Sequence, residues 1–563
     1  MFSRQFFRVG ARLVGSRRLV SSGIPPTKRH RSTRALKVIA GLGIGGTILY
    51  NTSDSFKHGV LMVERIGVVT VATARCFKLY KNTLDAQYDT EEIRAAALKV
   101  THLKAATITL HALEKNGGIY IKLGQHLTAL TYLLPPEWTN TMIPLQQECP
   151  QSSMEEIQQL FQRDMGVSIE DYFSEFDPEP VGVASLAQVH IARLKETNEK
   201  VAVKIQHPSL QQFVPLDVFL TNTVFELMYK FFPEYPLTWL GDEMQNLIYT
   251  ELDFTKEAQN AMATQEYFAK YKDSTALRIP SIKSAEHRIL IMEYVGGARL
   301  DDLKYMNDHN IDASKVSACL SHIFNNMIFT PGVGVHCDPH GGNLAIRSVA
   351  NGTGNGTNSH NFEIILYDHG LYRQIPLQMR RDYSHFWLAV LDNDIPNMKK
   401  YAKRFAGIEG EQKFKIFACA ITGRDPENSL NYDITKPRTK DEMLNIHTQL
   451  NEDGILEDLM DILSSMPRIV LLILKTNDLT RNLDEGLNNP LGPERTFLIM
   501  ANYCARTVYE EQNELVSLTS TKYSFKWLWG KLDNWIWYQR RLSSLYIYDW
   551  IMTIKNFKAK LSL

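Results

Sequence analysis

Residues 336–343 read HCDPHGGN and residues 364–370 read IILYDHG, and these two stretches decide the fold. The first places Asp338 and Asn343 five positions apart, which is the D-x-x-x-x-N spacing of a phosphotransfer catalytic loop. The second is an apolar run, which is typical of a buried strand, and Asp368 lies at its end. Each pattern is weak alone, so the residues upstream determine whether the two belong to one site.

Residues 180–206 predict a β-hairpin, because apolar residues alternate on both arms and the polar residues 196–200 lie between them. The second arm reads VAVK and places Lys204 among apolar neighbours, where a partly buried ammonium needs an anionic partner. An ordinary edge-strand lysine is the alternative that VAVK alone leaves open. Residues 290–297, LIMEYVGG, predict a strand that runs into glycines, as in a segment that joins two lobes.

Taken in order, these features match the set used for phosphoryl transfer: a strand lysine, a hinge, a catalytic-loop Asp with Asn, and a metal-binding Asp. We therefore expect an α+β, bilobal protein-kinase-like fold that binds ATP and Mg²⁺. Lys204 would neutralise charge on the triphosphate, and Asn343 with Asp368 would hold Mg²⁺. Asp338 would orient or deprotonate the acceptor.

Two further groups of residues complete the expected site. The carboxylate that positions Lys204 would be Glu251 or Glu257, both in the segment TELDFTKEAQN, which we expect to be helical. The phosphate-covering loop and the hinge would supply the nucleotide contacts, namely Gly182, Ala184, Ser185, Lys204, Glu293 and Val295. Cys337 replaces the usual catalytic-loop arginine and no APE-like segment follows Asp368, so an extended peptide substrate has no platform.

Histidines and cysteines are the remaining candidates for metal chemistry. His336, His340 and His369 could suggest a metal cluster, but they lack the spacing of a ligand set, so core or hydrogen-bonding roles are expected. The six cysteines are scattered and include no CxxC pair, which favours neither a zinc site nor a disulfide framework.

The charge of the 563-residue chain is balanced, with 62 basic and 62 acidic side chains, yet it is unevenly distributed. Residues 1–53 hold ten Lys or Arg and no acid, whereas the rest hold 52 basic and 62 acidic groups, which disfavours nucleic-acid binding. Residues 1–34 interleave arginines, apolar residues and serines, as in a mitochondrial presequence; a basic disordered tail is the alternative. We expect residues 35–53 to form a short transmembrane or anchoring segment in the inner membrane, with the body facing the intermembrane space.

The C-terminal residues 516–563 are rich in tryptophan. Five of the eight tryptophans of the chain lie between residues 527 and 550, mixed with lysines and arginines. This mixture is typical of a segment at a membrane interface. A C-terminal helix that docks on the body through its aromatic side chains explains the pattern equally well.

The chain resembles the UbiB family of atypical kinase-like proteins, also called the aarF-domain or ADCK group. The resemblance rests on the KxGQ motif at residues 122–125, the alanine-rich loop ASLAQVH at 184–190 and the ExD motif at 251–253, and it covers roughly residues 80–480. It implies that the KxGQ helix covers the place where a protein substrate would bind, that Lys122 pairs with Glu251, and that Lys204 pairs with Glu257. It further implies ATPase activity, lipid or isoprenoid partners, and a link to coenzyme Q and mitochondrial lipid homeostasis.

These observations predict a helical KxGQ extension at 54–165, an N-lobe and hinge at 166–297 with an inserted helix at about 209–232, and a C-lobe at 298–515. The expected function is that of a membrane-tethered ATPase or small-molecule kinase. A non-catalytic, nucleotide-gated lipid-binding or scaffold protein is the alternative from another class, and an active protein kinase is the weakest reading.

Overall fold

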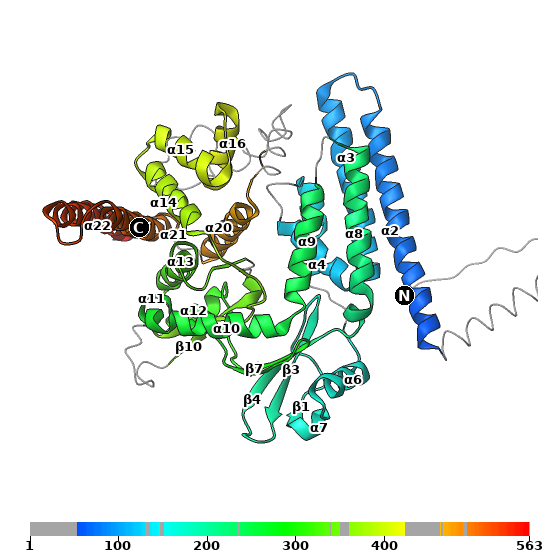
Figure 1. Ribbon diagram of the computed structural model, residues 1–563. Coiled ribbons are helices and arrows are strands. Elements are labelled where there is room, and N and C mark those ends of the chain that lie inside the picture. The colour runs from blue at the N-terminus through cyan, green and yellow to red at the C-terminus, as the bar shows by residue number, and fades with distance from the viewer. Residues whose placement is uncertain are drawn as a thin grey trace, which may run out of the picture. The chain divides into compact units, whose positions relative to one another are not determined.

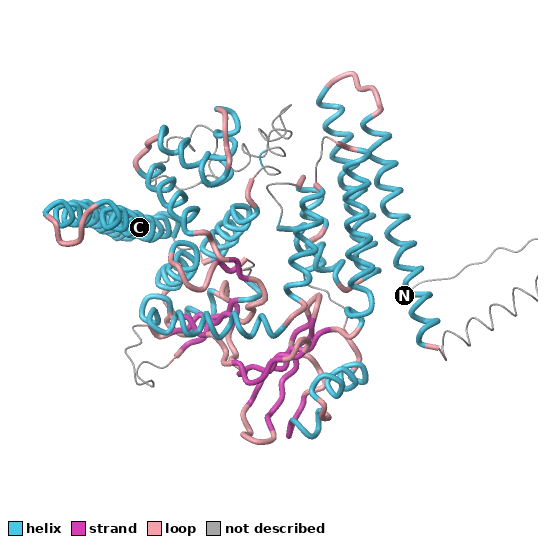
Figure 2. Tube along the Cα trace, viewed as in Figure 1, coloured by secondary structure: helices cyan, strands magenta, loops and turns pink. Residues whose placement is uncertain are grey.

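The computed structural model describes most of the chain (Figure 1), in these ranges: 53–129, 134–146, 151–233, 237–337, 339, 341–349, 360–422, 462, 466–487 and 492–561. The chain divides into two compact units, residues 1–65 and 66–563. Of the first unit, only residues 53–65 are described, so the expected presequence and nearly all of the expected anchor lie outside the described residues. Among the helices that are described, none has the length and apolar character needed to cross a membrane. Most of the described chain is helical (Figure 2), and its strands lie between residues 173 and 373.

The N-lobe is built on an antiparallel sheet with the strand order β1 (Phe173–Phe176), β3 (Ala187–Leu194), β4 (Lys200–Gln206), β7 (Ile289–Glu293) and β6 (Ile282–Ala285). The predicted hairpin is therefore confirmed as β3 and β4, which pair Val189 with Lys204. Val201, Val203 and Ile205 form a core with α6 (Met154–Met165) on one face. Because side chains alternate along a strand, Ala202 and Lys204 face the other side, where Ala202 packs near α10 (Phe254–Phe268).

The helical extension packs through a small core of its own. The buried side chains of this core are Ala106 and Leu113 of α3 (Glu91–Asn116), Tyr120 and Ile121 of α4 (Ile119–Ala129), Met142 after α5 (Pro136–Thr141), and Leu145 of the 3₁₀ turn η1 (Ile143–Gln146). Gly117 and Gly118 have φ values of 63° and 57°, which allows the tight turn between α3 and α4. Helix α6 packs on the N-lobe sheet, so the expected boundary at residue 165 groups it with the extension although its apolar face belongs to the N-lobe core.

The inserted helix expected at about 209–232 is confirmed as α8 (Ser209–Phe231). Together with α9 (Thr238–Glu251), it forms the surface on which the KxGQ helix α4 rests. Ile119 of α4 is buried there with Leu210, Val214 and Val218 of α8 and Ile248 of α9. This packing brings Lys122 of α4 to Glu251 at the end of α9.

The C-lobe contains a sheet in the order β5 (Leu277–Arg278), β11 (Phe362–Leu366), β10 (Leu344–Ser348) and β8 (Ala298–Arg299). Its helices include α12 (Leu303–Asp308), α13 (Ala313–Phe329), α14 (Leu377–Leu391), α15 (Ile395–Ala406), α16 (Glu411–Thr422), α20 (Arg468–Gly486) and α21 (Gly492–Thr519). A two-stranded pair of β9 (Val335–His336) with β12 (Tyr372–Arg373) places His336 opposite Tyr372. This pairing lays His336, the first residue of the HCDPHGGN stretch, beside the chain segment that carries Asp368.

The C-terminal helix α22 (Phe525–Leu561) packs against α21. Leu545 is buried between Leu498 and Ala501 of α21, and Trp537 packs on the main C-lobe core. Docking through one face is therefore confirmed. Trp529 and Trp550 are exposed on the other face. The expected boundary at residue 516 falls inside α21, because that helix continues to Thr519 before the chain turns.

Candidate active site

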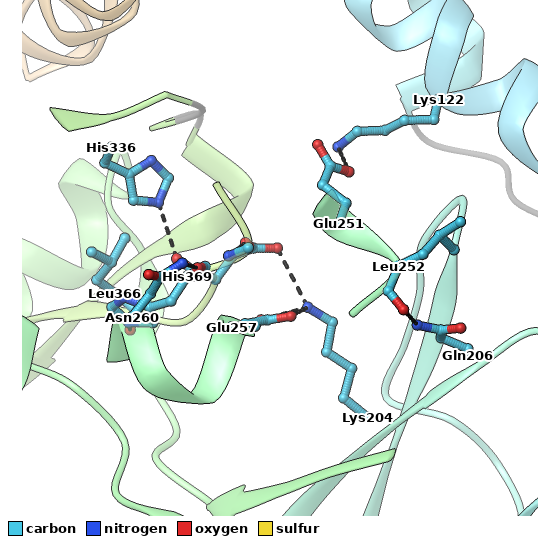
Figure 3. A network of polar contacts seen from close by, with 12 residues as sticks. Lys122, Lys204, Gln206, Glu251, Leu252, Glu257, Asn260, His336, Leu366 and His369 are labelled. Atoms are coloured by element: carbon cyan, nitrogen blue, oxygen red, sulfur yellow. Dashed lines mark hydrogen bonds and ion pairs between the residues drawn. The ribbon is translucent and has the colours of Figure 1, made fainter. Parts of the chain in front are cut away.

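Lys204 lies at the centre of a cluster of charges. Its ammonium contacts both carboxylate oxygens of Glu257, at 2.7 and 2.9 Å, and lies 3.5 Å from Oδ2 of Asp368 (Figure 3). The three residues come from β4, from the first turn of α10 and from the stretch after β11, and they are up to 164 positions apart in sequence. Their convergence is the arrangement that the ordered motifs predict.

A break between two helices places the two candidate glutamates beside different lysines. The segment expected to be helical is interrupted at Leu252 and Asp253: Glu251 ends α9, and Asp253 caps α10 by accepting a hydrogen bond from the N–H of Thr255. Glu251 therefore pairs with Lys122 of the KxGQ helix at 2.9 Å, whereas Glu257 pairs with Lys204 (Figure 3). Both pairings implied by the resemblance are confirmed, while the residues alone had left both glutamates open as partners of Lys204.

The electrostatics fix the charges of Lys204 and Asp368. Burial alone would lower the pKa of Lys204, but the negative charges of Asp368 and Glu257 more than offset it and raise the pKa. Burial raises the pKa of Glu257 to about 7, although the ammonium of Lys204 opposes this shift. Burial also opposes ionisation of Asp368, yet Lys204 and the N–H of Gly370 hold the pKa of Asp368 well below its usual range. Lys204 is thus a fixed cation, and Asp368 is a fixed anion.

Asp368 is held by its own backbone surroundings. The N–H of Gly370 donates to Oδ1 of Asp368 at 2.8 Å, and Nε2 of His336 donates to the Asp368 carbonyl at 3.0 Å. Asn260, one turn after Glu257 on α10, donates to the carbonyl of His369 at 2.9 Å. These contacts orient the Asp368 side chain, of which 37% remains exposed.

The histidines have structural roles. His336 and His369 are buried, and the ring of His369 stacks on Tyr372 while its Nε2 lies 3.2 Å from the carbonyl of Leu366. Burial lowers the pKa of His369 to about 3, so this ring is neutral. The expected core and hydrogen-bonding roles are confirmed for these two residues, and His340 lies outside the described residues.

The catalytic loop is described only in part. Asp338 lies outside the described residues. Asn343 ends the 3₁₀ turn η3 (Gly341–Asn343), and its carbonyl accepts a hydrogen bond from the N–H of Tyr367 at 3.0 Å. Since Tyr367 directly precedes Asp368, the fold brings the two expected metal ligands to the same end of the β10–β11 pair.

The residues around Asp368 fit a magnesium ion. An ionised carboxylate with an exposed side and a neighbouring amide side chain are hard oxygen donors, which Mg²⁺ prefers in combination with water and phosphate oxygens. Within the described ranges, no group of three or more His, Cys, Asp or Glu side chains is arranged to hold a metal alone. Cys76, Cys319 and Cys504 are free thiols.

The alanine-rich loop is fastened to the KxGQ helix. Gly182 belongs to the short strand β2 (Gly182–Val183), and the N–H of Ala184 donates to the carbonyl of Ala187 at 2.7 Å. Ser185 is buried and donates to Oε1 of Gln125 at 3.3 Å, while the amide of Gln125 donates to the Leu145 carbonyl at 3.0 Å. The loop that we expect over the phosphates is thus positioned by the last residue of the KxGQ motif.

The expected hinge residues take part in the fold. The carboxylate of Glu293 accepts hydrogen bonds from Arg278 and from the N–H of Ser281, and the carbonyl of Val295 accepts one from Tyr367 at 2.8 Å. The side chain of Glu293 therefore stabilises the end of β7. Contacts of Gly182, Ala184, Ser185, Glu293 and Val295 with a nucleotide stay predictions.

Two residues that support the site were not predicted from the sequence. Gln206 donates to the Leu252 carbonyl at 2.6 Å and so fastens the α9–α10 break to β4. Asn260 supports the residue after Asp368. Its spacing of three from Glu257 places both on one helix face, a signal that was available in the quoted segment. Gln206 carried no comparable signal.

Comparisons with known proteins give the family. A model described as the ABC1 atypical kinase-like domain matches residues 144–402. The ABC1 family protein MCP2 of Saccharomyces cerevisiae is 57% identical over 97% of this chain and 96% of that protein. Its homolog in Schizosaccharomyces pombe is 45% identical over 87% of this chain and 88% of its own length. The AarF domain-containing kinase 1 of Drosophila melanogaster is 35% identical, covering 90% of this chain and 94% of that protein. The resemblance and the kinase-like fold class read from the motifs are confirmed.

Proposed function

This chain belongs to the family of ABC1 atypical kinase-like proteins, and on that premise we propose that it is an ATPase or small-molecule kinase that binds ATP with Mg²⁺. The observation that carries the proposal is Lys204 held between Glu257 and Asp368. Three charges from distant parts of the chain are kept at one point, at a considerable desolvation cost. A triphosphate with its metal is the ligand that such a constellation suits.

The chain's own residues would divide the work. Lys204 binds phosphate oxygens, and Glu257 keeps its ammonium in place. Asp368 and Asn343 would hold Mg²⁺, which when bound neutralises phosphate charge. Asp338, in the D-x-x-x-x-N stretch, would orient the acceptor or the attacking water.

A small acceptor or water suits the site better than a protein substrate. Lys122 and Glu251 each keep less than 15% of the side chain exposed and pair at 2.9 Å, which adds a second ion pair from the extension beside the Lys204 cluster. Cys337 is fully buried and cannot serve as the arginine that receives a phosphorylated activation loop. Both features support ATP hydrolysis or small-molecule phosphorylation.

We place this activity at the mitochondrial inner membrane, with the body in the intermembrane space, in coenzyme Q and phospholipid homeostasis or distribution. The support is the basic N-terminal segment with its apolar run and the family resemblance of the motifs. The partners would be inner-membrane lipids and coenzyme Q, its precursors or another isoprenoid lipid. The acidic body argues against nucleic acid as a partner.

A thermal-shift titration with Mg-ATP tests the nucleotide site. We expect the parent protein to be stabilised and Asp368→Asn to lose most of the shift, because the amide removes the metal-binding charge. Asp308→Asn, at an exposed helix end away from the cluster, is the matched control and should retain the shift. Absence of any nucleotide-dependent shift in the parent would contradict the proposal.

The Lys122–Glu251 pair also supports a second candidate, a nucleotide-gated lipid-binding or scaffold protein that does not turn over ATP. An ion pair between the extension and α9 can hold a resting conformation without chemistry. Phosphate release in the presence of liposomes with anionic lipid separates the two. An enzyme releases phosphate, and Asp338→Asn abolishes it; a scaffold binds Mg-ATP without release.

A further inference from the structure

We propose that the turn joining α21 to α22, with the helix ends beside it, docks on an anionic lipid surface. We call residues 515–532 the hairpin tip. The proposal deepens the membrane association suggested above by assigning it a surface, and it does not depend on nucleotide chemistry.

The hairpin tip exposes large apolar side chains at a density unusual for a surface. Phe525 is 81% exposed, Leu518 75% and Trp529 62%. The other exposed members are Leu515, Tyr523, Leu528 and Leu532. Exposed apolar residues are normal when scattered singly, but a contiguous group marks a contact surface.

The apolar residues share one side of α22. Phe525, Leu528, Trp529 and Leu532 follow the three- and four-residue spacing of a single helix face. The rings of Phe525 and Trp529 are stacked, with an interplanar angle of 15°. A Cβ added at Gly530 would lie 3.0 Å from Val516 of α21, so the two helices approach closely at this point. The aromatic side chains are therefore presented by a well-packed pair of helices.

The positive charge of the hairpin tip indicates that the surface it binds is anionic. The hairpin tip carries Lys522, Lys526 and Lys531 and no acidic residue, and residues 520–563 together hold eight basic and two acidic side chains. Lys522 lies over the ring of Tyr523, and Lys531 over that of Trp527. Trp and Tyr beside lysine are suited to the headgroup region, where the ring lies among the acyl chains and the ammonium meets phosphate.

Acidic residues flank the hairpin tip, with Glu514 directly before it and Asp533 directly after it, and three glutamates of α21 are paired. Glu511 contacts His385 at 2.7 Å, Glu514 pairs with Arg381, and Glu510 contacts Arg506 at 3.0 Å. The first two contacts join α21 to α14. Between residues 515 and 532, every charged side chain is a lysine.

Partition of the full chain into vesicles tests the proposal. The vesicles are phosphatidylcholine with about 30 mol% phosphatidylglycerol, and phosphatidylcholine alone for comparison. We expect Phe525→Ser/Trp529→Ser to weaken partition at least about 10-fold on both vesicles. Lys522→Gln/Lys526→Gln should weaken it about 10-fold on anionic vesicles, with little effect on neutral ones.

Matched controls remove exposed aromatic residues or exposed lysines from other parts of the surface. Phe219→Ser/Tyr229→Ser deletes two exposed aromatic residues of α8, and Lys304→Gln/Lys315→Gln deletes two exposed lysines of the C-lobe. All variants keep the same N-terminal segment, so differences between them report the hairpin tip. Controls should stay within about 2-fold of the parent.

Two results would overturn the proposal. One is equal partition of the hairpin-tip variants and the controls. The other is a parent that self-associates through this surface, seen as a change in its size-exclusion volume that the Phe525→Ser/Trp529→Ser variant abolishes without a change in vesicle partition. A Mg-ATP thermal shift measured on the same variants should equal that of the parent, so failure here is distinct from failure of the proposed nucleotide site.

Discussion

The Lys204 cluster and the hairpin tip both depart from the usual distribution of side chains, in which charged groups face water and large apolar groups are buried. In the cluster, charged groups are removed from water: Glu257 is 3% exposed and meets an ammonium with both oxygens. In the hairpin tip, large apolar groups are left in water. Folding alone favours neither arrangement, because burying charge and exposing apolar surface both cost free energy.

The difference lies in how each region is held. Every described member of the Lys204 cluster is fixed by a partner from another element, so the geometry exists before a ligand arrives. The hairpin tip contains three lysines and no acidic residue of its own, so we expect its complement to come from outside the chain. The comparison therefore predicts that substitutions in the cluster cost stability, whereas substitutions in the hairpin tip cost binding alone.

The largest expected effect comes from removing the partner of the buried lysine. Glu257→Ala leaves Lys204 with Asp368 as its remaining counter-charge, and we expect a loss of about 3 kcal/mol in the free energy of unfolding. Chemical denaturation without nucleotide measures it. The double variant Lys204→Met/Glu257→Met should lose less, because no unpaired charge is left behind. A loss below about 0.5 kcal/mol in Glu257→Ala would show that the pair is not structural.

A smaller loss is expected at the edge of the cluster, in the KxGQ helix. A Cβ at Gly124 would collide with the buried Leu145 side chain and lie 3.2 Å from Leu113. We expect Gly124→Ala to lower the free energy of unfolding by about 1–3 kcal/mol through overpacking. Gly67→Ala, with open space around its Cβ position, is the control. A double variant with Leu145→Ala should recover part of the loss, and no recovery would contradict the packing explanation.

The smallest expected effect is in the hairpin tip. Lys522→Gln/Lys526→Gln and Phe525→Ser should each change the free energy of unfolding by no more than about 0.5 kcal/mol, since exposed side chains contribute little to folding. The same denaturation experiment measures it. A loss of several kcal/mol would mean that these residues support the fold, and the contrast with the Lys204 cluster would disappear.

Much of this architecture could be predicted from the sequence because its signals are local. Alternation identified β3 and β4, an apolar run identified β11, and motif order brought Lys204, Asn343 and Asp368 to one site. The α9–α10 break was missed because TELDFTKEAQN has helix-forming residues on both sides of Asp253. The cap depends on the Asp253 carboxylate, which accepts hydrogen bonds from the N–H and the hydroxyl of Thr255. The contact of Gln206 with Leu252 spans 46 positions, and no local pattern encodes it.

The α9–α10 break ties two lysines to one short stretch of backbone. Glu251 and Glu257 are six positions apart, and Gln206, two residues after Lys204, holds the Leu252 carbonyl between them. A molecule that draws Lys122 away from Glu251 would shift α9 and, through this stretch, the surroundings of Lys204. Thermodynamic reciprocity then requires Mg-ATP to alter the affinity for that molecule by the same factor. Two molecules that bind at Lys122 and at Lys204 would in this way regulate each other's binding without touching.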